Sequence, residues 1–185
     1  MQPFAVGIAD NGNYFSTVAS ATTVSDFLAE KKIALGEKDY IFPALDAKIF
    51  PESRIIIERA LPISIEVDGK NIKIDTLGTN VGDAINEAGI VLSHADKVAP
   101  DTNSLLAPNL AVKITRINFE EITLKEDIPF QTVEKEDNTV LWRKKQTKQK
   151  GEKGVREKTY KVTYTNGKET NRALLGSKIA KQPIS

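Results

Sequence analysis

The sequence predicts an α+β protein in which two copies of one small module precede a third, all-β segment. The first observation is an ungapped repeat, since residues recur 57 positions later: Thr22 as Thr79, Val24 as Val81, Asp26 as Asp83, Ile33 as Ile90, Pro43 as Pro100 and Arg59 as Arg116. The second observation is that each copy changes from a strand period to a helical period and back. The third is that no helical period follows residue 117. Because a copy of this length can fold as a small unit, the predicted domains are 1–60, 61–117 and 118–185.

The hairpin of the module is clearest in the second copy. Apolar and polar residues alternate over 63–67, which is typical of a half-buried strand. Asp68 and Gly69 follow, a dipeptide that favours a two-residue hairpin turn. The alternation resumes over 72–75, so a return strand is predicted there.

A helix is predicted after this hairpin. Asn80 is a favourable N-cap, and Asp83 lies in the first turn, where the helix dipole favours negative charge. Four apolar residues at spacing i, i+3, i+4 and i+7 form one helical face: Val81, Ala84, Ile85 and Ala88. Gly89 suits the left-handed residue that ends a helix. A closing strand is predicted over 110–114, with a short strand near Val98.

The first copy repeats this order of elements. Its equivalent residues are Val6 and Ile8 with the turn Asn11-Gly12, then Val24, Phe27 and Leu28 on the helix, then Ile55 and Ile57 on the closing strand. One difference is that Lys32 stands where the second copy has Gly89. A lysine in the left-handed region costs on the order of 1 kcal/mol, so the first helix is expected to end differently.

A hairpin, a crossing helix and a closing strand make up the β-grasp, or ubiquitin-like, plan. These residues resemble the small ubiquitin-like domain of unknown function that occurs in tandem in bacterial resuscitation-promoting factors and related cell-wall proteins. Besides the hairpin, the resemblance rests on Thr79, Val81, Gly82, Asp83, Ala84, Ala88, Gly89, Ile90, Asp96, Val98 and Pro100. It covers 61–117 well and 4–60 moderately.

The third segment is predicted to be thin, extended and all-β. Residues 159–165 alternate strongly, with Tyr160, Val162 and Tyr164 on one face. Asn166 and Gly167 then favour a tight turn into a return strand that begins at 168–170.

This segment resembles the G-five domain, which is named for its recurrent glycines. The resemblance rests on Ile128-Pro129-Phe130-x-Thr132, Gly151-x-x-Gly154 and Tyr160-x-Val162-x-Tyr164-x-Asn166-Gly167-Lys168-Glu169. It implies a secreted bacterial protein that takes part in adhesion and binds N-acetylglucosamine. Where the family usually carries a glycine soon after the position of Leu141, this chain has the run 142–145, which puts a close backbone contact there in doubt.

Aromatic side chains of the third segment are the candidates for glycan contact, because sugars pack their C–H faces on aromatic rings. The candidates are Trp142, Tyr160 and Tyr164. The alternative for the two tyrosines, and the favoured one, is that they cover the small core of the domain.

Charge divides the same segment into two parts. Residues 118–142 carry seven acidic and two basic side chains, and residues 143–158 carry eight basic and two acidic. The favoured interpretation is that two strands pair with opposite charges facing each other. The alternative is a site for a wall polyanion formed by Arg143, Lys144, Lys145 and Lys148.

Composition argues against most catalytic and metal-binding chemistry. The chain has no cysteine and one histidine, His94, which is expected in a solvated loop, so no metal and no cofactor is predicted. Acidic pairs such as Glu120 with Glu121 and Glu134 with Glu136 lie among other charges and are expected to be solvated. The net charge of +1 predicts no nucleic-acid partner, no apolar run is long enough to span a membrane, and no signal-peptide pattern begins the sequence.

The resulting expectation is a non-catalytic, extracellular region that binds peptidoglycan or another wall glycan and acts as a spacer. The resemblance implies that catalysis in related wall hydrolases resides in a separate domain. A module that recruits a wall-associated protein is the alternative. An enzyme is disfavoured.

Overall fold

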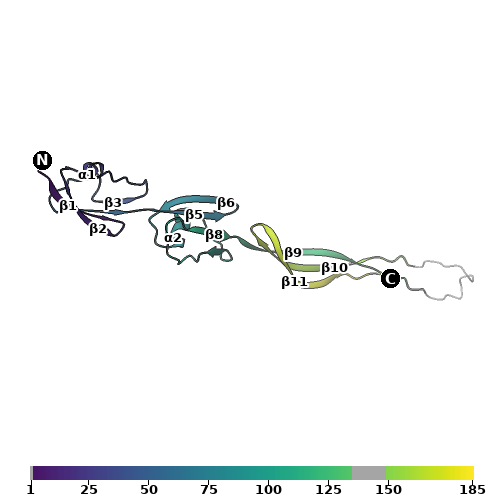
Figure 1. Cartoon of the computed structure of the whole chain (residues 1–185). Coiled ribbons are helices and arrows are strands. Elements are labelled where there is room, and N and C mark those ends of the chain that lie inside the picture. The colour runs from purple at the N-terminus through teal and green to yellow at the C-terminus, as the bar shows by residue number, and fades with distance from the viewer. Residues whose placement is uncertain (1, 135–148) are drawn as a thin grey trace, which may run out of the picture. The chain divides into compact units, whose positions relative to one another are not determined.

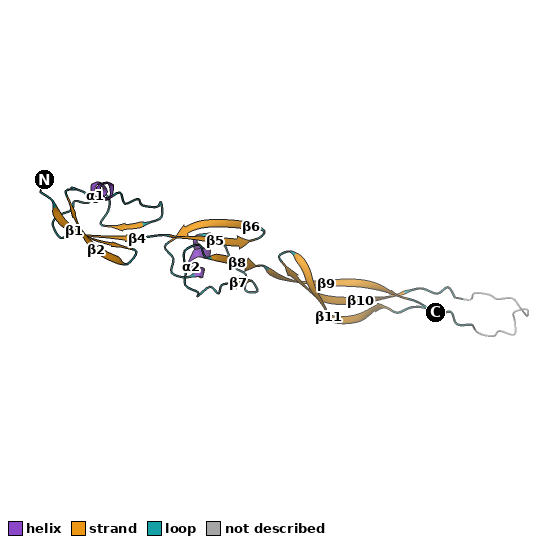
Figure 2. Ribbon diagram, in the orientation of Figure 1, coloured by secondary structure: helices purple, strands orange, loops and turns teal. Residues whose placement is uncertain are grey.

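The computed structural model describes residues 2–134 and 149–185. Over these residues the chain is mostly β-strand with two short helices, and it divides into two compact units, 1–115 and 116–185. Figure 1 labels most of these elements, and β4 and β7 are labelled in Figure 2. Figure 2 shows one short helix beside each of the first two sheets and none beside the third.

The first sheet has the strand order β2-β1-β4-β3. In chain order, the strands of this sheet and the helix beside it are β1 (Phe4–Asp10), β2 (Asn13–Ala19), α1 (Val24–Lys31), β3 (Tyr40–Phe42) and β4 (Arg54–Glu58). The hairpin β1-β2 and the pair β3-β4 are antiparallel, whereas β1 and β4 are parallel.

The second sheet repeats this topology in the order β6-β5-β8-β7. Its elements are β5 (Leu61–Val67), β6 (Lys70–Thr76), α2 (Val81–Glu87), β7 (Lys97–Ala99) and β8 (Ala111–Thr115). The predicted hairpin, helix and closing strand are therefore confirmed, as is the short strand near Val98. The corresponding strand β3 of the first copy was not predicted.

Each of these two sheets has its own hydrophobic core. The first core contains Val6, Ile8, Ala19, Ala21, Val24, Phe27, Leu28, Ile49, Ile55 and Ile57. The second contains Ile63, Ile65, Val67, Val81, Ala84, Ile85, Val112 and Ile114. Burial of each large aliphatic or aromatic side chain contributes about 1.5–3 kcal/mol, so the helix and sheet of each copy are held together mainly by these contacts.

The two helices begin in the same way. The side chains of Thr23 and Asn80 accept hydrogen bonds from the backbone amides of Asp26 and Asp83, at 3.1 and 3.0 Å. In the second helix Asp83 also accepts from the backbone amide of Asn80, which completes a capping box. The predicted N-cap at Asn80 is confirmed.

The ends of the two helices correct the expectation for Lys32. Lys32 has φ 55°, and Gly89 at the equivalent position has φ 70°. In both copies the next residue closes the same turn, because the amides of Ile33 and Ile90 donate to the carbonyls of Leu28 and Ile85. The expectation that the first helix ends differently is wrong, since this turn holds a lysine in the left-handed region despite its local cost.

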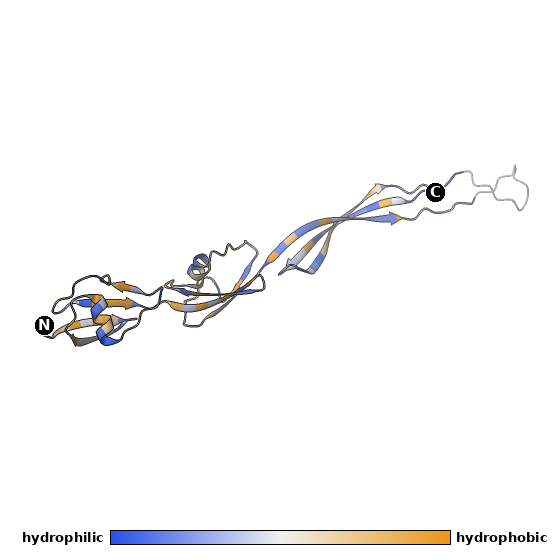
Figure 3. Cartoon of the chain, turned by 90° about the horizontal axis from the view of Figure 1, so that it is seen from above, coloured by the Kyte–Doolittle hydropathy of each residue, from blue (hydrophilic) through white to orange (hydrophobic). Residues whose placement is uncertain are grey.

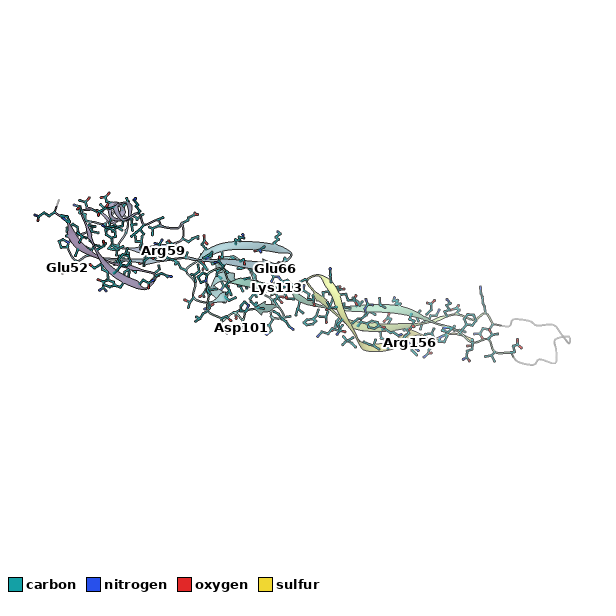
Figure 4. The ribbon with its side chains drawn as sticks, viewed as in Figure 1. Glu52, Arg59, Glu66, Asp101, Lys113 and Arg156 are labelled. Atoms are coloured by element: carbon teal, nitrogen blue, oxygen red, sulfur yellow. The ribbon has the colours of Figure 1, made fainter. Side chains whose placement is uncertain are left out.

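A partly buried ion-pair cluster closes the first copy at Arg59, which is labelled in Figure 4. The Arg59 guanidinium donates to Asp10 at 2.7 Å and to Asp39 at 2.8 Å. Asp39 also accepts hydrogen bonds from the backbone amides of Gly36 and Ala60, both at 2.9 Å. Its side chain is only 7% exposed. Through these hydrogen bonds Asp39 joins the loop before β3 to the segment after β4.

We expect Asp39→Asn to lower the free energy of unfolding of the first copy by about 2 kcal/mol, because it removes the charge of the least exposed partner in a partly buried ion pair. Burial raises the pKa of Asp39, but the Gly36 and Ala60 amides and Arg59 outweigh burial, and the net shift is downward. A carboxyl with a lowered folded pKa stabilises the fold above its unfolded value of about 3.9 and loses that contribution as the pH falls further.

The measurement is chemical denaturation of both proteins between pH 7 and pH 2, with Asp46→Asn as the control because Asp46 is exposed. The difference between Asp39→Asn and the native chain should shrink below about pH 4. A difference that stays constant down to pH 2 would contradict the role given to the Asp39 charge.

The third sheet has the strand order β11-β10-β9 and is antiparallel throughout. Its strands are β9 (Ile117–Ile128), β10 (Gly154–Thr165) and β11 (Lys168–Lys181). The pairing of β9 with β10 is regular, whereas the register of β11 shifts at three points. Among the described residues of 116–185, Val162 is the only fully buried hydrophobic side chain, so this sheet lacks a core like those of the first two.

Candidate glycan-binding site

Tyr160 and Tyr164 lie on one face of the central strand β10, on either side of Val162. Both tyrosines are half-buried, and Val162 is fully buried between them. The guanidinium carbon of Arg172 on β11 lies 5.8 Å from the centre of the Tyr160 ring, within the range of a cation–π contact. The predicted strand is confirmed, and the two tyrosines flank the one fully buried hydrophobic side chain among the described residues of this sheet.

Both acidic and basic side chains lie close to the two tyrosines. Partial burial and the neighbouring Glu120 carboxylate raise the pKa of Tyr164. Arg172 makes two hydrogen bonds to Glu169, at 2.8 and 2.9 Å, and this pairing lowers the pKa of the Glu169 carboxyl. We call the side of β10 that carries Tyr160 and Tyr164 the tyrosine face. It offers hydroxyl groups and ring edges next to charged side chains, which is chemistry suited to a polar, uncharged ligand such as a sugar.

The other residues predicted from sequence lie outside the described residues. These are the glycan candidate Trp142 and the polyanion candidates Arg143, Lys144, Lys145 and Lys148. Their roles stay predictions.

The described charges of the third segment pair across strands. Lys158 lies 2.7 Å from Glu126, and Lys153 lies 2.9 Å from Asp127. The Lys158 pairing lowers the pKa of Glu126 and raises that of Lys158. The favoured interpretation of the charge division, that opposite charges face each other on paired strands, is confirmed for these residues.

Sequence reasoning missed a shallow hollow on the opposite face of this sheet. The hollow has a volume of about 250 Å³ and is lined by Glu157, Thr159, Gly176, Ser177 and Lys178. It lies where the register between β10 and β11 shifts, between Thr159 and Tyr160. Such a shift cannot be read from the alternation of one strand, although the Gly176-Ser177 pair in a long strand signals an irregular edge.

Glu157 is the most enclosed charge in this hollow. Its side chain is 20% exposed and lies 3.1 Å from the Lys178 ammonium and 3.9 Å from that of Lys125. Next to it, the hydroxyls of Thr159 and Thr123 are 3.2 Å apart. The carboxylate of Glu157, the hydroxyls of Thr159 and Ser177 and the ammonium group of Lys178 line one hollow and provide both acceptors and donors for the hydroxyl and acetamido groups of an amino sugar.

The described residues contain no cluster of three or more histidine, cysteine or acidic side chains able to hold a metal ion. His94 is exposed, in the loop between α2 and β7, as predicted. The helices of the described chain are too short and too polar to cross a bilayer.

Comparison with known families identifies the class of protein. A model of the G5 domain matches residues 120–185, and a model of the G5-linked ubiquitin-like domain matches residues 8–46 and 63–103. The chain therefore belongs to the proteins that carry G5-linked ubiquitin-like domains followed by a G5 domain. The resemblance drawn from the sequence is confirmed.

Among curated proteins, the chain is 32% identical over 168 residues to YabE of Bacillus subtilis, which is named for a proposed role in cell wall shaping. It is 29% identical over 107 residues to the resuscitation-promoting factor Rpf2 of Corynebacterium glutamicum, and 19% identical over 231 residues to RpfB of Mycolicibacterium smegmatis. These alignments cover 90%, 57% and 94% of the chain. The chain spans only 41%, 28% and 64% of the lengths of these relatives.

Proposed function

We propose that this chain is a non-catalytic, extracellular region that binds wall glycan through its G5 domain. In this proposal it consists of three domains, 1–60, 61–117 and 118–185, and the two α+β ubiquitin-like domains act as spacers. The observation that carries the proposal is the order of matched domains, two ubiquitin-like segments followed by a G5 domain, in a chain that aligns with relatives named for cell wall shaping and resuscitation.

The chemistry of the third sheet supports a glycan as the ligand. Its tyrosine face presents Tyr160 and Tyr164, and its opposite face presents the hollow around Glu157. A shallow hollow with paired donors and acceptors suits a hydrated saccharide better than a fully apolar ligand. Neither family model that matches the chain is that of a catalytic domain, which supports a binding role.

The test has two parts. The full chain is sedimented with insoluble peptidoglycan, and N-acetylglucosamine oligomers are titrated into isotopically labelled protein while backbone chemical shifts are recorded. We expect co-sedimentation, with backbone chemical-shift changes in residues of β10 and β11. A chain that stays in the supernatant and shows no shifts would refute the proposal.

A matched pair of variants locates the contact. Glu157→Gln keeps the shape of the hollow but removes its charge, and we expect affinity for the oligomer to fall about tenfold, as for loss of one charge-assisted hydrogen bond. Glu121→Gln makes the same change at an exposed carboxylate of β9 and should leave affinity unchanged. If the two variants change the affinity for the oligomer equally, Glu157 does not contact the ligand.

One observation favours a second candidate, a surface that recruits a wall-associated protein. Leu124, Leu174 and Ile179 of the third sheet are all about half exposed. Exposed apolar side chains of this kind occur at protein interaction sites. A protein partner that is retained from wall extracts after complete glycan digestion, and is lost on Leu174→Ser, would favour this candidate over glycan binding.

A further inference from the structure

The outward face of the first sheet, which points away from α1, carries an unusual set of side chains. Val6, Ile8, Ile55 and Ile57 point into the core, so their strand neighbours point outward. The pairing registers place one outward row across the sheet: Tyr14 on β2, Ala9 on β1, Ile56 on β4 and Phe42 on β3. Tyr40, opposite Glu58, and Val18, opposite Ala5, lie on the same face. We call these residues the aromatic face.

The rings of the aromatic face are accessible. Tyr14 is 61% exposed, Phe42 is 55% exposed and Tyr40 is 47% exposed. The outward residues of the strand between β2 and β4 are small, namely Ala5, Gly7 and Ala9. The aromatic rings therefore lie beside a strand whose outward surface consists only of backbone and methyl groups. Figure 3 shows hydrophobic residues, in orange, on the strands of this first sheet.

Tyr14 is held in place by its neighbours. A Cβ atom at Gly7 would come within 2.7 Å of the Tyr14 hydroxyl and 3.2 Å of its ring, so the ring extends over Gly7. The guanidinium carbon of Arg54, opposite Gly7 on β4, lies 5.2 Å from the ring centre. The ring is thus positioned before any ligand arrives, which reduces the entropy cost of binding.

The second copy shows that this face is not required by the fold. At the positions equivalent to Tyr14, Val18, Tyr40, Phe42 and Ile56 it has Asn71, Asp75, Lys97, Ala99 and Lys113. Glu66 and Lys113, labelled in Figure 4, pair on adjacent strands at 3.4 Å on this outward face. Two copies with the same strand order therefore have opposite surface chemistry, and the aromatic face of the first needs another explanation.

The size of the face limits its occupant. Four strands about 4.8 Å apart, with outward residues spread over some five positions of about 3.3 Å, make a plane of roughly 300 Å². A stable protein–protein interface needs about 800 Å² per partner. The rings lie at defined positions on the sheet, and the outward hydrogen-bonding side chains of Arg54, Glu58 and Ser16 lie among them.

We propose that the aromatic face binds a neutral glycan chain, whose sugar rings stack their C–H faces on Tyr14, Tyr40 and Phe42. This is a site on the first copy, distinct from the third sheet and independent of whether the third sheet binds glycan. Stacking on aromatic rings supplies the apolar contact, and the polar side chains among the rings contact the sugar hydroxyls.

The test uses the full chain and hexa-N-acetylglucosamine as the probe, with backbone chemical shifts as the readout. The variant is the double change Tyr14→Asn and Tyr40→Lys, which installs the residues that the second copy carries at these positions. The control makes the changes Asn71→Ser and Lys97→Gln in the second copy. Unfolding curves of both variants check that the sheets remain folded.

We expect shifts on β1, β2 and β4 in the native chain, in the control and in Glu157→Gln, and at least a tenfold weaker response of these strands in the double variant. No shifts on the first sheet of the native chain would overturn the proposal, even if β10 and β11 respond. If the proposed G5 site does not bind the probe, the backbone shifts of β10 and β11 should instead stay unchanged. Concentration-dependent dimerisation that the double variant abolishes, without glycan shifts on these strands, would also overturn it, because the face would then join two copies.

Discussion

Replacing Phe27 with alanine is expected to lower the free energy of unfolding of the first copy by about 4 kcal/mol. Phe27 is the largest fully buried side chain of the described residues, and it lies on α1 against the first sheet. Its loss would leave a cavity that the surrounding side chains fill only in part. Because a small domain has only about 5–15 kcal/mol of stability in total, much of the first copy should unfold.

Comparison with the second copy shows why an alanine is accommodated at position 84 but is not expected to be accommodated at position 27. Ala84, equivalent to Phe27, is also fully buried. There, Ile74 and Leu110 pack against the core at the positions of Thr17 and Ser53. The first copy has smaller and more polar residues at those positions and so has no apolar volume to offer in place of the ring.

Amide hydrogen exchange of the full chain checks this prediction. Phe27→Ala should raise exchange rates in β1, β2 and β4 while leaving those in β5, β6 and β8 close to native values. Phe50→Ala is the control, because Phe50 belongs to the same copy but is mostly exposed. Equal protection of the first sheet in Phe27→Ala and Phe50→Ala would contradict the account of this core.

Gly154→Ala is expected to destabilise the third sheet by about 3 kcal/mol. A Cβ atom at Gly154 would lie 2.6 Å from the carbonyl oxygen of Lys181 and 2.6 Å from the backbone nitrogen of Pro183. Both contacts are with backbone atoms, which cannot rotate away as a side chain can. The recurrent glycine of the G5 motif is therefore explained here by the close approach of the chain after β11.

Gly176→Ala is the matched control for this change. Nothing lies within 4 Å of a Cβ atom placed there, although Gly176 belongs to the same sheet. Hydrogen exchange in β9, β10 and β11 should accelerate in Gly154→Ala and stay close to native in Gly176→Ala. Similar exchange in the two variants would show that the contact with Lys181 and Pro183 does not determine stability.

The parts of the fold that the sequence predicted well depend on local signals. Asp68 and Gly69 form the expected turn with positive φ angles, and Asn166 and Gly167 do the same. The side chain of Asn80 caps its helix within three residues. Such contacts lie close together in the sequence, so the pattern and the structure agree.

Two of the failures depend on pairing between strands, whereas the failure at Lys32 concerns a local turn that outweighs the preference of the single residue. Lys32 takes the left-handed conformation because the turn closed by Ile33 outweighs the preference of a lysine. The hollow at Glu157 exists because β11 shifts its register beside β10, which neither strand shows alone. The aromatic face was missed for a related reason, since only the pairing of four strands brings Tyr14 and Phe42 to one side.

The parallel pairing of β1 with β4 also has a mechanical consequence. In the first copy the chain enters along β1 and leaves along β4, and these two strands are hydrogen-bonded side by side in the same direction. A pull applied at Phe4 and at Glu58 would thus shear all of their shared hydrogen bonds together instead of opening them one after another. The equivalent pairing of β5 with β8 gives the second copy the same resistance to tension.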